Sequence, residues 1–511
     1  MPDVDPLVPI PQPPGHLLVG NLFDLASGSL FDRLTALARE FGPIYRLDLP
    51  GGNSRIVVSS AELVDELCDE SRFDKSLGPG LRALNDGPTG HGLFTSETSD
   101  PAWRKAHNIL VPAFSLGAMH TYHPMMLDIA IQLMQKWERL NSDDTVDVPA
   151  DMTRLTLDTI ALCGFGYRFN SFYRDTPHPF VLAMLGSLAA AQKQSSQLPI
   201  QRELNRKLKR EMKEHGEFMS GTVRRIIQER RASGAAGTVN DLLDRMLTGV
   251  DRQSGQSLDE TNIISQCITF LVAGHETTSG LLSFAVYELL KNPEILARAY
   301  EEADRVLGTD TSVLPTYAQV HQMPYVSQIL DETLRLWPTA PAFNRHAHED
   351  TVIGGKYRLV KDETVTILVG TLHRDPKVWG PDPGHFDPDR FSPENRTRIP
   401  QNAYKPFGTG QRACIGRQFA LQEASLILGM LLQRFEFVDF ADYQLKIKQA
   451  LTIKPDGFHI RVKRRAGRVA SVSMAASPDP TAAPAQAIEP AATPVPGADG
   501  HHTPLLVLYG S

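Results

Sequence analysis

The stretch Phe407–Gly416, FGTGQRACIG, places one cysteine among residues small enough to let backbone amides approach a sulfur atom: Gly408, Gly410 and Gly416. Close amide donors and the start of the helix expected over 418–432 favour the thiolate form of Cys414, which is the form that binds a metal. Arg412 stands two residues before this cysteine and could pair with a carboxylate of a bound ligand. The pattern therefore predicts a thiolate ligand for a metal.

Two other interpretations of this stretch fit the sequence less well. Gly408–Ala413 matches the G-x-G-x-x-A pattern of dinucleotide-binding proteins, but the preceding NAYKPF is not a hydrophobic strand and no β-α-β unit surrounds it. A lone cysteine is usually a small buried apolar residue, and that interpretation suits Cys68, Cys163 and Cys267. The glycines and the arginine around Cys414 favour a ligand instead.

A second unusual segment, Ala273–Thr278 (AGHETT), lies inside a long apolar helix expected over 261–290. His275 and Glu276 match half of the H-E-x-x-H zinc motif, but the second histidine of that motif is absent. A threonine hydroxyl that donates to the carbonyl one turn earlier weakens the helix. That would open a groove beside the hydroxyl of Thr277 and a proton source, Glu276. Each residue alone has a structural explanation, whereas the cluster indicates function.

A third group involves two cationic side chains and one acid. Glu332 and Arg335 are three residues apart, so they share one face of a helix and can form an ion pair. Downstream, Arg390 in FDPDRF offers a second guanidinium to the same carboxylate. We interpret the three as a structural group that fixes the loop carrying Cys414.

Together and in this order, these stretches resemble the cytochrome P450 (haem-thiolate monooxygenase) superfamily. The shared patterns are F-x-x-G-x-R-x-C-x-G, A-G-x-E-T-T, E-x-x-R and F-x-P-x-R-F, and the resemblance covers about residues 11–462. It implies a mainly α, triangular cytochrome P450 fold with a large helical lobe, a small β lobe and haem b (iron protoporphyrin IX) between them.

The resemblance also implies roles for single residues. Cys414 would be the axial ligand of the haem iron, and its thiolate favours cleavage of the O–O bond of O2. Thr277 and Glu276 would steer the protons that this cleavage requires. Further side chains would bind the haem, the first three of them at its propionates: Arg412, Trp103, His107, Lys75, Phe407, Ala273, Gly408 and Gly416.

Several stretches, among them HGLFTS, AHNILVPAF and FLVAGHETTSGLLSFAVY, resemble bacterial fatty-acid hydroxylases that are fused to their own reductase. This closer resemblance implies that Phe94 sits over the haem and limits how far a substrate chain can slide. Ala340 and Ala342 would line the opposite wall of the substrate channel.

The mouth of that channel departs from the subfamily. Its members hold the fatty carboxylate with an arginine and a tyrosine, whereas GGNSRIVVSS puts Asn53 and Val57 at the corresponding positions. Arg55, between them, could have shifted into this role. We therefore expect the type of reaction to be better specified than the identity of the substrate.

The expected function is insertion of one oxygen atom from O2 into a subterminal C–H bond of a medium- or long-chain fatty acid. NADPH would supply the electrons through FAD and FMN of a flavin reductase domain fused C-terminally. A peroxide-driven peroxygenase is one alternative, but such an enzyme has no need of proton relay residues like Thr277 and Glu276. A non-catalytic haem carrier or gas sensor is another, and it would have little use for a substrate channel.

Composition agrees with a globular enzyme. The 511 residues are 41% hydrophobic and 22% charged, and a net charge of −7 gives no support to nucleic-acid binding. The four widely spaced cysteines argue against a disulfide framework and for a reducing compartment, so we expect a cytoplasmic protein. No signal peptide and no membrane span are expected, because no stretch of about 18 uncharged apolar residues occurs.

The expected organisation has four parts. Residues 1–30 form an extended segment, because Pro9–Pro14 disfavours helix, and residues 31–466 form one haem monooxygenase domain. Its expected helices are 31–41, 124–140, 151–163, 203–231, 261–290, 292–307 and 319–336. Its expected strands are 44–49, 56–59, 352–353, 364–369 and 458–462.

The other two parts lie at the C-terminal end. Residues 467–502 form an expected disordered linker, because 15 of the 26 residues in 475–500 are Ala or Pro and none is aromatic. The apolar run Leu505–Tyr509 is followed by Gly-Ser. With the resemblance, 503–511 would be the truncated first strand of a flavodoxin-like FMN domain, and the natural chain would continue into the reductase.

Overall fold

The computed structural model of the chain describes residues 7–16, 20–21, 23–25, 30–49, 53–85, 90–195, 205–234, 236–449 and 452–467. The linker predicted over 467–502, apart from Gly467, and the strand predicted over 503–511 lie outside the described residues. In the predicted N-terminal segment, residues 7–15 form neither helix nor strand, and a single 3₁₀ turn follows at Phe23–Leu25.

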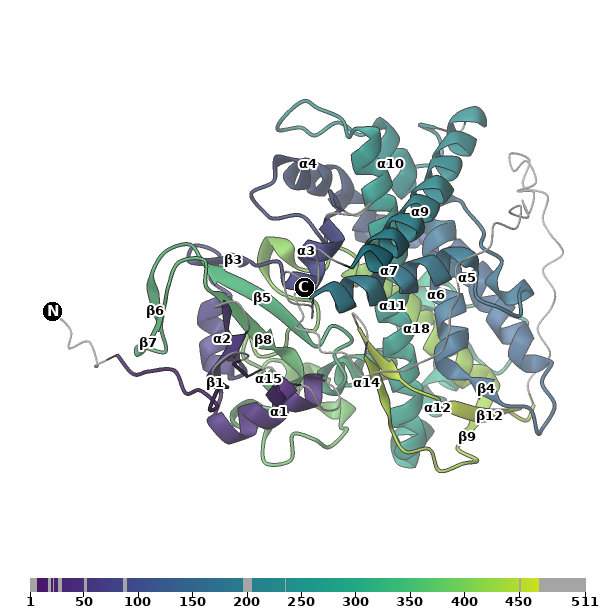
Figure 1. Ribbon diagram of the computed structural model, residues 1–511. Coiled ribbons are helices and arrows are strands. Elements are labelled where there is room, and N and C mark those ends of the chain that lie inside the picture. Colours follow the sequence, from purple (N-terminus) through teal and green to yellow (C-terminus); the bar gives the residue numbers. More distant parts are fainter. Residues whose placement is uncertain are drawn as a thin grey trace.

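The described residues form a small β-rich lobe and a large helical lobe, which lie side by side in Figure 1. This is the mainly α, two-lobed architecture expected from the sequence, and the fold class is confirmed. The β-rich lobe consists of α1 (Leu30–Phe41), β1 (Ile44–Leu49), β2 (Asn53–Val58), α2 (Ala61–Leu67), β3 (Phe73–Lys75), β5 (Ala342–Ala347), β6 (Thr351–Ile353), β7 (Tyr357–Leu359) and β8 (Thr364–Leu368).

The main sheet of this lobe has the strand order β1-β2-β8-β5-β3, with β2 parallel to β8 and the other pairs antiparallel. Successive side chains of a strand point to opposite faces. Accordingly, Ile56 and Val58 pack among the residues that surround α2, whereas Val57 packs against α1. Because both faces are covered there, the second half of β2, Ile56–Val58, is apolar.

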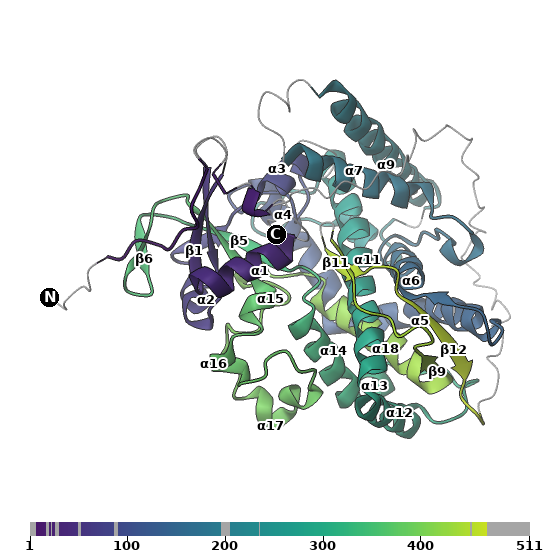
Figure 2. The same cartoon turned by 60° about the horizontal axis from the view of Figure 1, so that its bottom comes forward.

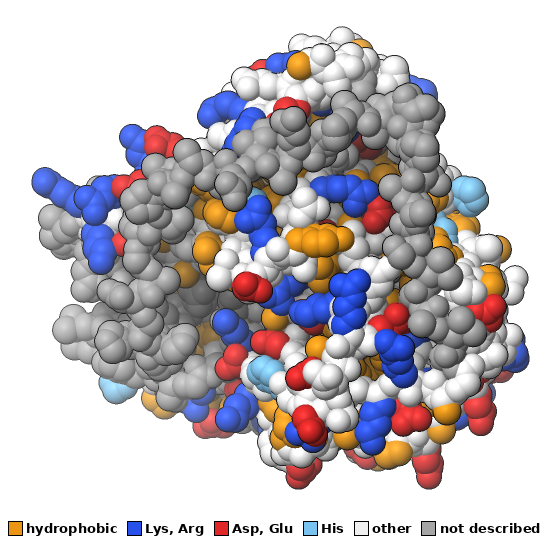
Figure 3. All heavy atoms as spheres, turned by 90° about the vertical axis from the view of Figure 1, so that its right-hand side faces the viewer, with side chains coloured by type: hydrophobic (Ala, Val, Ile, Leu, Met, Phe, Trp, Pro, Cys, Tyr) orange, Lys and Arg blue, Asp and Glu red, His pale blue; other side chains and the backbone are white. Residues whose placement is uncertain are grey.

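The helical lobe is built from long helices with short connections. In chain order they are α4 (Pro101–Leu110), α5 (Leu116–Glu138), α6 (Val148–Phe165), α7 (Pro179–Ser195), α9 (Arg206–Ala232), α10 (Leu242–Thr248), α11 (Glu260–Lys291), α12 (Pro293–Leu307), α13 (Tyr317–Val320), α14 (Pro324–Leu336) and α18 (Arg417–Arg434). One face of this lobe carries positive and negative side chains interspersed over its described part (Figure 3).

Helix α11 runs through the middle of the helical lobe and contacts α6, α9, α12, α14 and α18. A helix that is apolar on all sides is stable only when it is buried, and most side chains of α11 are buried. The closest neighbour is α6, because Gly274 has no side chain there. A Cβ atom at this position would lie 2.9 Å from Ile160.

Short elements complete the fold. Strands β4 (Val146–Asp147), β9 (Phe435–Val438) and β12 (His459–Arg464) form one small sheet, and β10 (Ile447–Gln449) pairs with β11 (Ile453–Pro455). Strand β11 lies against α11. Figure 2 shows α15 (Val369–Leu372), α16 (Pro376–Trp379) and α17 (Pro393–Arg396) along the segment that leads from the β-rich lobe towards the Cys414 loop. One further helix, α3 (Pro79–Asn85), lies against α7.

Two predicted helices differ from the structure, and one strand of the main sheet was missed. The helix predicted over 124–140 begins at Leu116, because Ser115 caps its start and Pro124 is accommodated inside it. The helix predicted over 319–336 is two helices, α13 and α14, since Pro324 is the first residue of a new helix. Strand β5 was not predicted, because its sequence AFNRHA contains three polar residues and therefore does not match the apolar pattern of a buried strand.

Candidate functional site

The Cys414 loop is held by its own backbone. The N–H of Cys414 donates to the carbonyl of Phe407 over 2.8 Å, and that of Gly408 donates to the carbonyl of Lys405 over 3.2 Å. Gly408 and Gly410 have φ of 72° and 61°, a conformation that favours glycine. Helix α18 begins directly after Gly416. The loop therefore holds the cysteine in a defined position before a helix start.

Gly410 is also required by its surroundings. The N–H of Gln411 donates to the carboxylate of Glu70 over 2.7 Å. A Cβ atom at position 410 would lie 2.2 Å from the Glu70 carboxyl group. The β-rich lobe thus contacts the second half of the loop directly.

The side chain of Cys414 is exposed, whereas Cys163 and Cys267 are buried, and all four cysteines are free. Although the sulfur faces open space, the protein atoms around the loop desolvate it and raise the pKa of the Cys414 thiol; a hydrogen bond from Gly416 and the charge of Arg417 lower it in part. A thiol in such surroundings becomes a thiolate when it binds a metal cation. The donor set therefore suits a thiolate-bound iron.

Five of the predicted haem and substrate residues form one connected group. Arg412 stacks on Trp103 at 4.5 Å, and Trp103 stacks on His107 with 5.0 Å between ring centroids. Lys75 donates to the carbonyl of Phe94 over 2.7 Å, with its Nζ atom 4.8 Å from the centre of the Phe94 ring. Burial lowers the pKa of His107, and the charge of Arg412 adds to this.

Within this group Lys75 and Arg412 are two neighbouring cations, and the charges of Asp74 and Glu97 offset their repulsion only in part. Burial lowers the pKa of Lys75, and the charge of Arg412 lowers it further. In the described part of the chain neither side chain forms an ion pair with a carboxylate; Arg412 donates instead to Thr98 and to the carbonyls of Leu93 and Ser96. An anion between the two cations would relieve their repulsion. The propionates of the haem implied by the sequence are suitable anions.

Helix α11 offers a matching opening. Ala273 is exposed although it lies in the middle of a helix that is otherwise mostly buried. Thr277 donates its hydroxyl to the carbonyl of Ala273 over 3.0 Å, in the same exposed turn. Phe270, one turn earlier, packs on Phe114 at 5.5 Å, and a Cβ atom at Gly416 would lie 3.9 Å from the same ring. An open space therefore adjoins this turn near the Cys414 loop, as a haem would need.

Glu276, the neighbour of Thr277, has different partners. Its carboxylate lies 3.1 Å from the Nζ atom of Lys454 on β11 and accepts a hydrogen bond from Thr452 over 3.2 Å. Burial alone would raise the pKa of Glu276, but Lys454 and His275 hold it well below its usual range. The carboxylate is therefore ionised and bound to β11, whereas the sequence analysis treated it as a free proton source.

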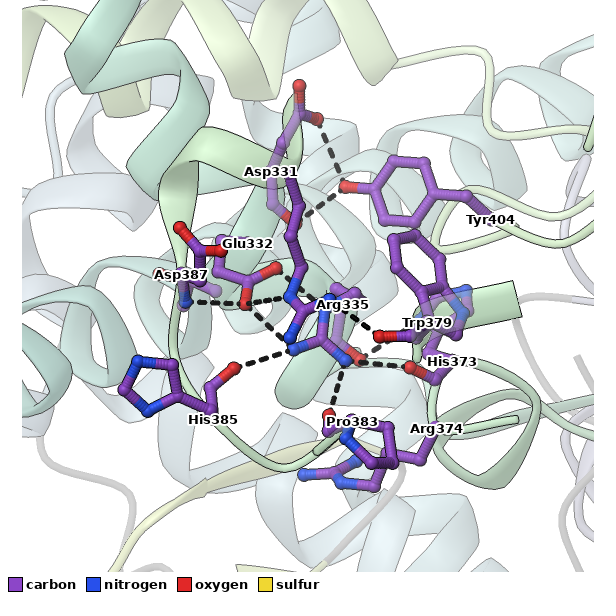
Figure 4. A network of polar contacts seen from close by, with 12 residues as sticks. Asp331, Glu332, Arg335, His373, Arg374, Trp379, Pro383, His385, Asp387 and Tyr404 are labelled. Carbon is purple, nitrogen blue, oxygen red and sulfur yellow. Dashed lines mark hydrogen bonds and ion pairs between the residues drawn. The ribbon is translucent and has the colours of Figure 1, made fainter. Parts of the chain in front are cut away.

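The structure brings Glu332 and Arg335 together (Figure 4), and Arg390 lies beside them. Arg335 donates twice to Glu332, over 2.6 and 2.7 Å, and both side chains are fully buried. The Nε atom of Arg390 lies 3.7 Å from the carboxylate, which is too long for a hydrogen bond. Instead, Arg390 donates to the carbonyls of Trp379 and Asp382. The third member of the group therefore acts mainly on the neighbouring backbone.

The predicted channel residues occupy two places. Val57 and Ala342 belong to the apolar cluster between β2, β5 and α1, while Ala340 is half-buried just before β5. Phe94 is half-buried beside Lys75, as described above. Arg55 lies on β2 two residues before Val57, so it points to the same side of the sheet, and it lines a cavity there together with Ala342.

Sequence reasoning missed several residues that contact the site. Lys454 and Thr452 bind Glu276 from β11, and Glu70 binds the Cys414 loop from the β-rich lobe. His373 was also missed, although its ring contacts the residue that begins this loop. Each of them is distant in the sequence from its partner, and no spacing pattern indicates such pairs.

In the described part of the chain, no helix combines the length and the apolar character that crossing a membrane requires.

Comparisons with known proteins agree with this geometry. A model of the cytochrome P450 family matches residues 10–462. A bifunctional cytochrome P450/NADPH–P450 reductase of Bacillus subtilis is 52% identical over 502 residues, which are 98% of this chain and 46% of that protein. A protein of the same kind from Bacillus cereus is 54% identical over 457 residues, or 89% of this chain and 42% of that protein.

A fungal relative shows the same relation. A self-sufficient cytochrome P450 monooxygenase of Exserohilum turcicum is 44% identical over 460 residues, or 90% of this chain and 42% of that protein. The chain thus spans somewhat less than half the length of these curated relatives. The resemblance inferred from the sequence motifs is confirmed: the chain belongs to the cytochrome P450 family.

Proposed function

We propose that the chain is the haem part of a monooxygenase that hydroxylates medium- or long-chain fatty acids at subterminal carbons, using O2 and electrons from NADPH. Membership in the cytochrome P450 family supports the oxygen chemistry. The names of the relatives, which include monooxygenases and P450/NADPH–P450 reductases, support the electron source. The fatty-acid part of the proposal is carried by one observation, the position of Arg55.

Arg55 is a buried cation in a largely apolar wall. It is only 5% exposed, and burial lowers its pKa to about 10, with a further contribution from the charge of Arg82. The cavity beside it measures about 10 Å³, roughly the space of one water molecule. Most residues that line this cavity are apolar: Leu30, Phe31, Leu34, Pro341, Ala342 and Leu368.

A fatty acid combines the anion and the apolar chain that this charge and this lining would bind, and the cavity, which has room for about one water molecule, would have to widen to admit it. A carboxylate beside Arg55 would make charge-assisted hydrogen bonds and offset the repulsion from Arg82. The methylene chain would then extend along the apolar wall that contains Ala342. Neither Asn53 nor Val57 is charged, so neither can replace the arginine that holds the carboxylate in the subfamily. Arg55, which lies between them on β2, would take over this role.

The remaining site residues have separate tasks in this proposal. Bound through Cys414, the haem would supply the iron centre at which O2 is activated. Lys75 and Arg412 would hold its propionates. The Thr277 hydroxyl, which is bound to the Ala273 carbonyl beside the open space, would pass a proton to the reacting oxygen. Glu276 would have to exchange its contact with Lys454 to supply that proton.

Spectroscopic titration of the purified haem protein tests the substrate class. Fatty acids of increasing chain length should shift the haem absorption band as they displace water from the iron. The matching fatty alcohols, which lack the carboxylate, should bind roughly tenfold to a hundredfold more weakly, because a charge-assisted hydrogen bond contributes about 1.5–3 kcal/mol. Arg55→Ala should remove this preference.

Arg46→Ala is the matched control, because Arg46 lies on the neighbouring strand β1 and pairs with Glu363. It should leave the preference for the acid unchanged. No spectral response to any chain length would contradict the fatty-acid assignment and favour a haem carrier or gas sensor. Hydroxylation that proceeds with hydrogen peroxide but not with a reductase and NADPH would favour a peroxygenase.

We also propose that the natural protein continues into a two-flavin reductase that binds FAD and FMN. The support is that the chain covers only 46% and 42% of relatives named P450/NADPH–P450 reductases. Sequencing the source gene beyond the codon for Ser511 tests this, and a stop codon there would contradict it. We further propose that the protein is cytoplasmic, as expected from its few, widely spaced cysteines.

A further inference from the structure

His373 connects the buried Glu332–Arg335 ion pair to Lys405, at the beginning of the Cys414 loop. It follows α15 directly and is fully buried. Its Nδ1 atom lies 3.1 Å from the carbonyl oxygen of Arg335, and its Nε2 atom lies 2.8 Å from the backbone nitrogen of Lys405. Both ring nitrogens are therefore engaged by two segments that are far apart in the sequence.

These contacts define one protonation state of the ring. The backbone N–H of Lys405 can only donate, so Nε2 of His373 must accept and carries no proton. The Arg335 carbonyl can only accept, so Nδ1 must carry the proton. Burial, followed by the charges of Arg335 and Arg374, lowers the pKa of His373 to about 3. The ring is thus neutral and in a single tautomer.

The Arg335 side of this connection is firmly fixed. Besides its two hydrogen bonds to Glu332, Arg335 donates to the carbonyls of Pro383 over 2.6 Å and of His385 over 3.0 Å. It also donates to the carbonyl of His373 over 2.9 Å, so the two residues are joined twice (Figure 4). His373 therefore belongs to the same buried hydrogen-bond network as the Glu332–Arg335 ion pair.

The Lys405 side leads to the cysteine. The carbonyl of Lys405 accepts from Gly408, and the carbonyl of Phe407 accepts from the N–H of Cys414 over 2.8 Å. The preceding residue, Tyr404, lies on the His373 ring with 5.1 Å between centroids and donates to the carbonyl of Asp331 over 2.9 Å. The first half of the loop is thus fastened to α14 through Tyr404 and through His373.

We propose that His373 is a positioning residue that sets where the Cys414 loop begins, by presenting one unprotonated ring nitrogen to the Lys405 amide. The second half of the loop is held separately, by Glu70 and by the contacts of Arg412. Without the His373 acceptor, the first half can shift while the second half stays in place. The Phe407 carbonyl then no longer fixes the Cys414 amide, and the sulfur loses its position relative to the haem. This inference rests on Cys414 as the iron ligand, but not on the identity of the substrate.

Three substitutions at this position separate the two hydrogen bonds. Glutamine can place an acceptor near the position of Nε2, whereas asparagine reaches only the position of Nδ1. His373→Gln should therefore keep the thiolate-type absorption of the reduced, carbon-monoxide-bound haem protein. His373→Asn and His373→Leu should convert to the form without thiolate ligation roughly tenfold faster, the effect of losing one buried hydrogen bond.

A matched control distinguishes positioning from simple destabilisation. His178 is another buried histidine whose pKa is lowered by burial to about 4, and it lies before α7. Among the described residues its ring contacts Phe169 and accepts from the Phe180 amide, and it does not contact the Cys414 loop. His178→Leu should lower the temperature of unfolding without accelerating the loss of thiolate ligation at temperatures where far-ultraviolet circular dichroism shows an intact fold. Amide hydrogen exchange at Lys405 should increase in His373→Asn but not in His178→Leu.

The outcomes separate this inference from the assignments on which it rests. If the wild-type protein itself lacks the thiolate band, the assignment of Cys414 as the ligand fails. If the wild type shows the band and His373→Asn and His373→Leu keep it as long, the positioning role of His373 is overturned. Equal losses in His373→Gln and His373→Asn would also overturn it, because the acceptor for Lys405 would then be irrelevant.

Discussion

Two buried glutamates on neighbouring helices have opposite surroundings. Glu332 on α14 accepts two hydrogen bonds from Arg335 and one from the Asp387 amide, and its side chain is fully buried. Glu276 on α11 contacts Lys454 and Thr452, which belong to the small β10–β11 hairpin, and its side chain is 10% exposed. The first carboxylate is held by a buried arginine and one backbone amide, whereas among the described residues the second contacts only side chains, those of Lys454, Thr452 and its neighbour His275.

We therefore expect Glu332 to stabilise the fold and Glu276 to serve the proposed reaction. Glu332, Arg335 and Arg390 together bind six backbone groups along the segment that leads to the Cys414 loop, so a change there must disturb the fold. The partners of Glu276 lie next to the exposed turn that contains Thr277, where a carboxylate that can exchange partners is useful. Mutations on the two helices should therefore affect different measurements.

The largest effect is expected at Arg335. Arg335→Met leaves the Glu332 charge buried without its partner and removes hydrogen bonds from three carbonyl groups. The loss of one member of a buried ion pair costs about 3–5 kcal/mol. Urea unfolding followed by circular dichroism should show this loss, and haem content should fall with it. A loss below about 1 kcal/mol, the value typical of a surface pair, would contradict the structural role.

A pH effect of nearly the same size is expected at Glu288, twelve residues after Glu276 on the same helix. Burial raises the pKa of Glu288 to about 7, and the charge of Glu332 adds to this. Between pH 4.5 and about 7 the unfolded chain loses this proton while the folded chain keeps it, so stability falls as the pH rises. The fall should reach about 3 kcal/mol.

Glu288→Gln tests this pH dependence directly. The variant should keep an acceptor for the Trp337 indole N–H, which donates to Glu288 over 2.6 Å. Its stability should change less between pH 4.5 and 7 than that of the wild type, as measured by urea unfolding at each pH. Parallel curves for the two proteins would show that Glu288 is not the titrating group.

A kinetic effect is expected at Thr277. Thr277→Ala removes the hydroxyl beside the exposed turn and should slow hydroxylation about a hundredfold, the lower end of the range for proton-transfer groups. The neighbouring Thr278, which is only 2% exposed, provides the matched control. With NADPH and an added reductase, product formation should fall in Thr277→Ala and stay within about twofold in Thr278→Ala. Equal rates in the two variants would argue against a proton role.

A smaller loss of stability is expected at Glu276. Glu276→Gln leaves Lys454 without its carboxylate, but the lysine still donates to Thr153 over 3.2 Å. We expect a loss of about 1–2 kcal/mol in urea unfolding. Adding Lys454→Met should recover part of this loss, because no charge then remains buried. A loss as large as that of Arg335→Met would remove the contrast between the two helices.

The smallest effect is expected at the surface, beside the buried group. Asp389 pairs with Arg298 through two contacts of 2.9 Å, but both side chains are about half exposed. Asp389→Asn should cost less than about 1 kcal/mol, because water screens exposed ion pairs. The same urea experiment provides the measurement. A larger loss would mean that the buried network extends to the surface at this point.

The parts of the site that are local in the sequence could be predicted, and the parts that join distant segments could not. The glycines around Cys414 and the spacing of Glu332 and Arg335 lie within one loop or one helical turn, so residue types alone indicate them. The contact of Glu276 with Lys454 joins α11 to β11, and the contact of His373 with Lys405 crosses 32 residues. Such pairs depend on how the two lobes are folded together.

Physical reasons of the same kind explain the errors in the fold. A proline predicts a helix boundary, and at Pro324 it marks one, whereas at Pro124 the helix has already begun under the cap of Ser115. The contact of Arg390 with Glu332 was predicted from charge and is present as an ion pair of 3.7 Å, whereas the hydrogen bonds of Arg390 to the carbonyls of Trp379 and Asp382 were not predicted. Charge indicates that a side chain needs a partner, but the fold decides which one.

The regular spacing of positions along strand β2 would set where the head of a bound substrate chain lies. Positions on the same side of a strand are about 7 Å apart, and Arg55 occupies one of three such positions, between Asn53 and Val57. Moving the cation by one such step would move the head of a bound chain by the length of several methylene groups. The carbon presented to the iron would change accordingly, so the choice of strand position could set the site of oxidation without any change near the haem.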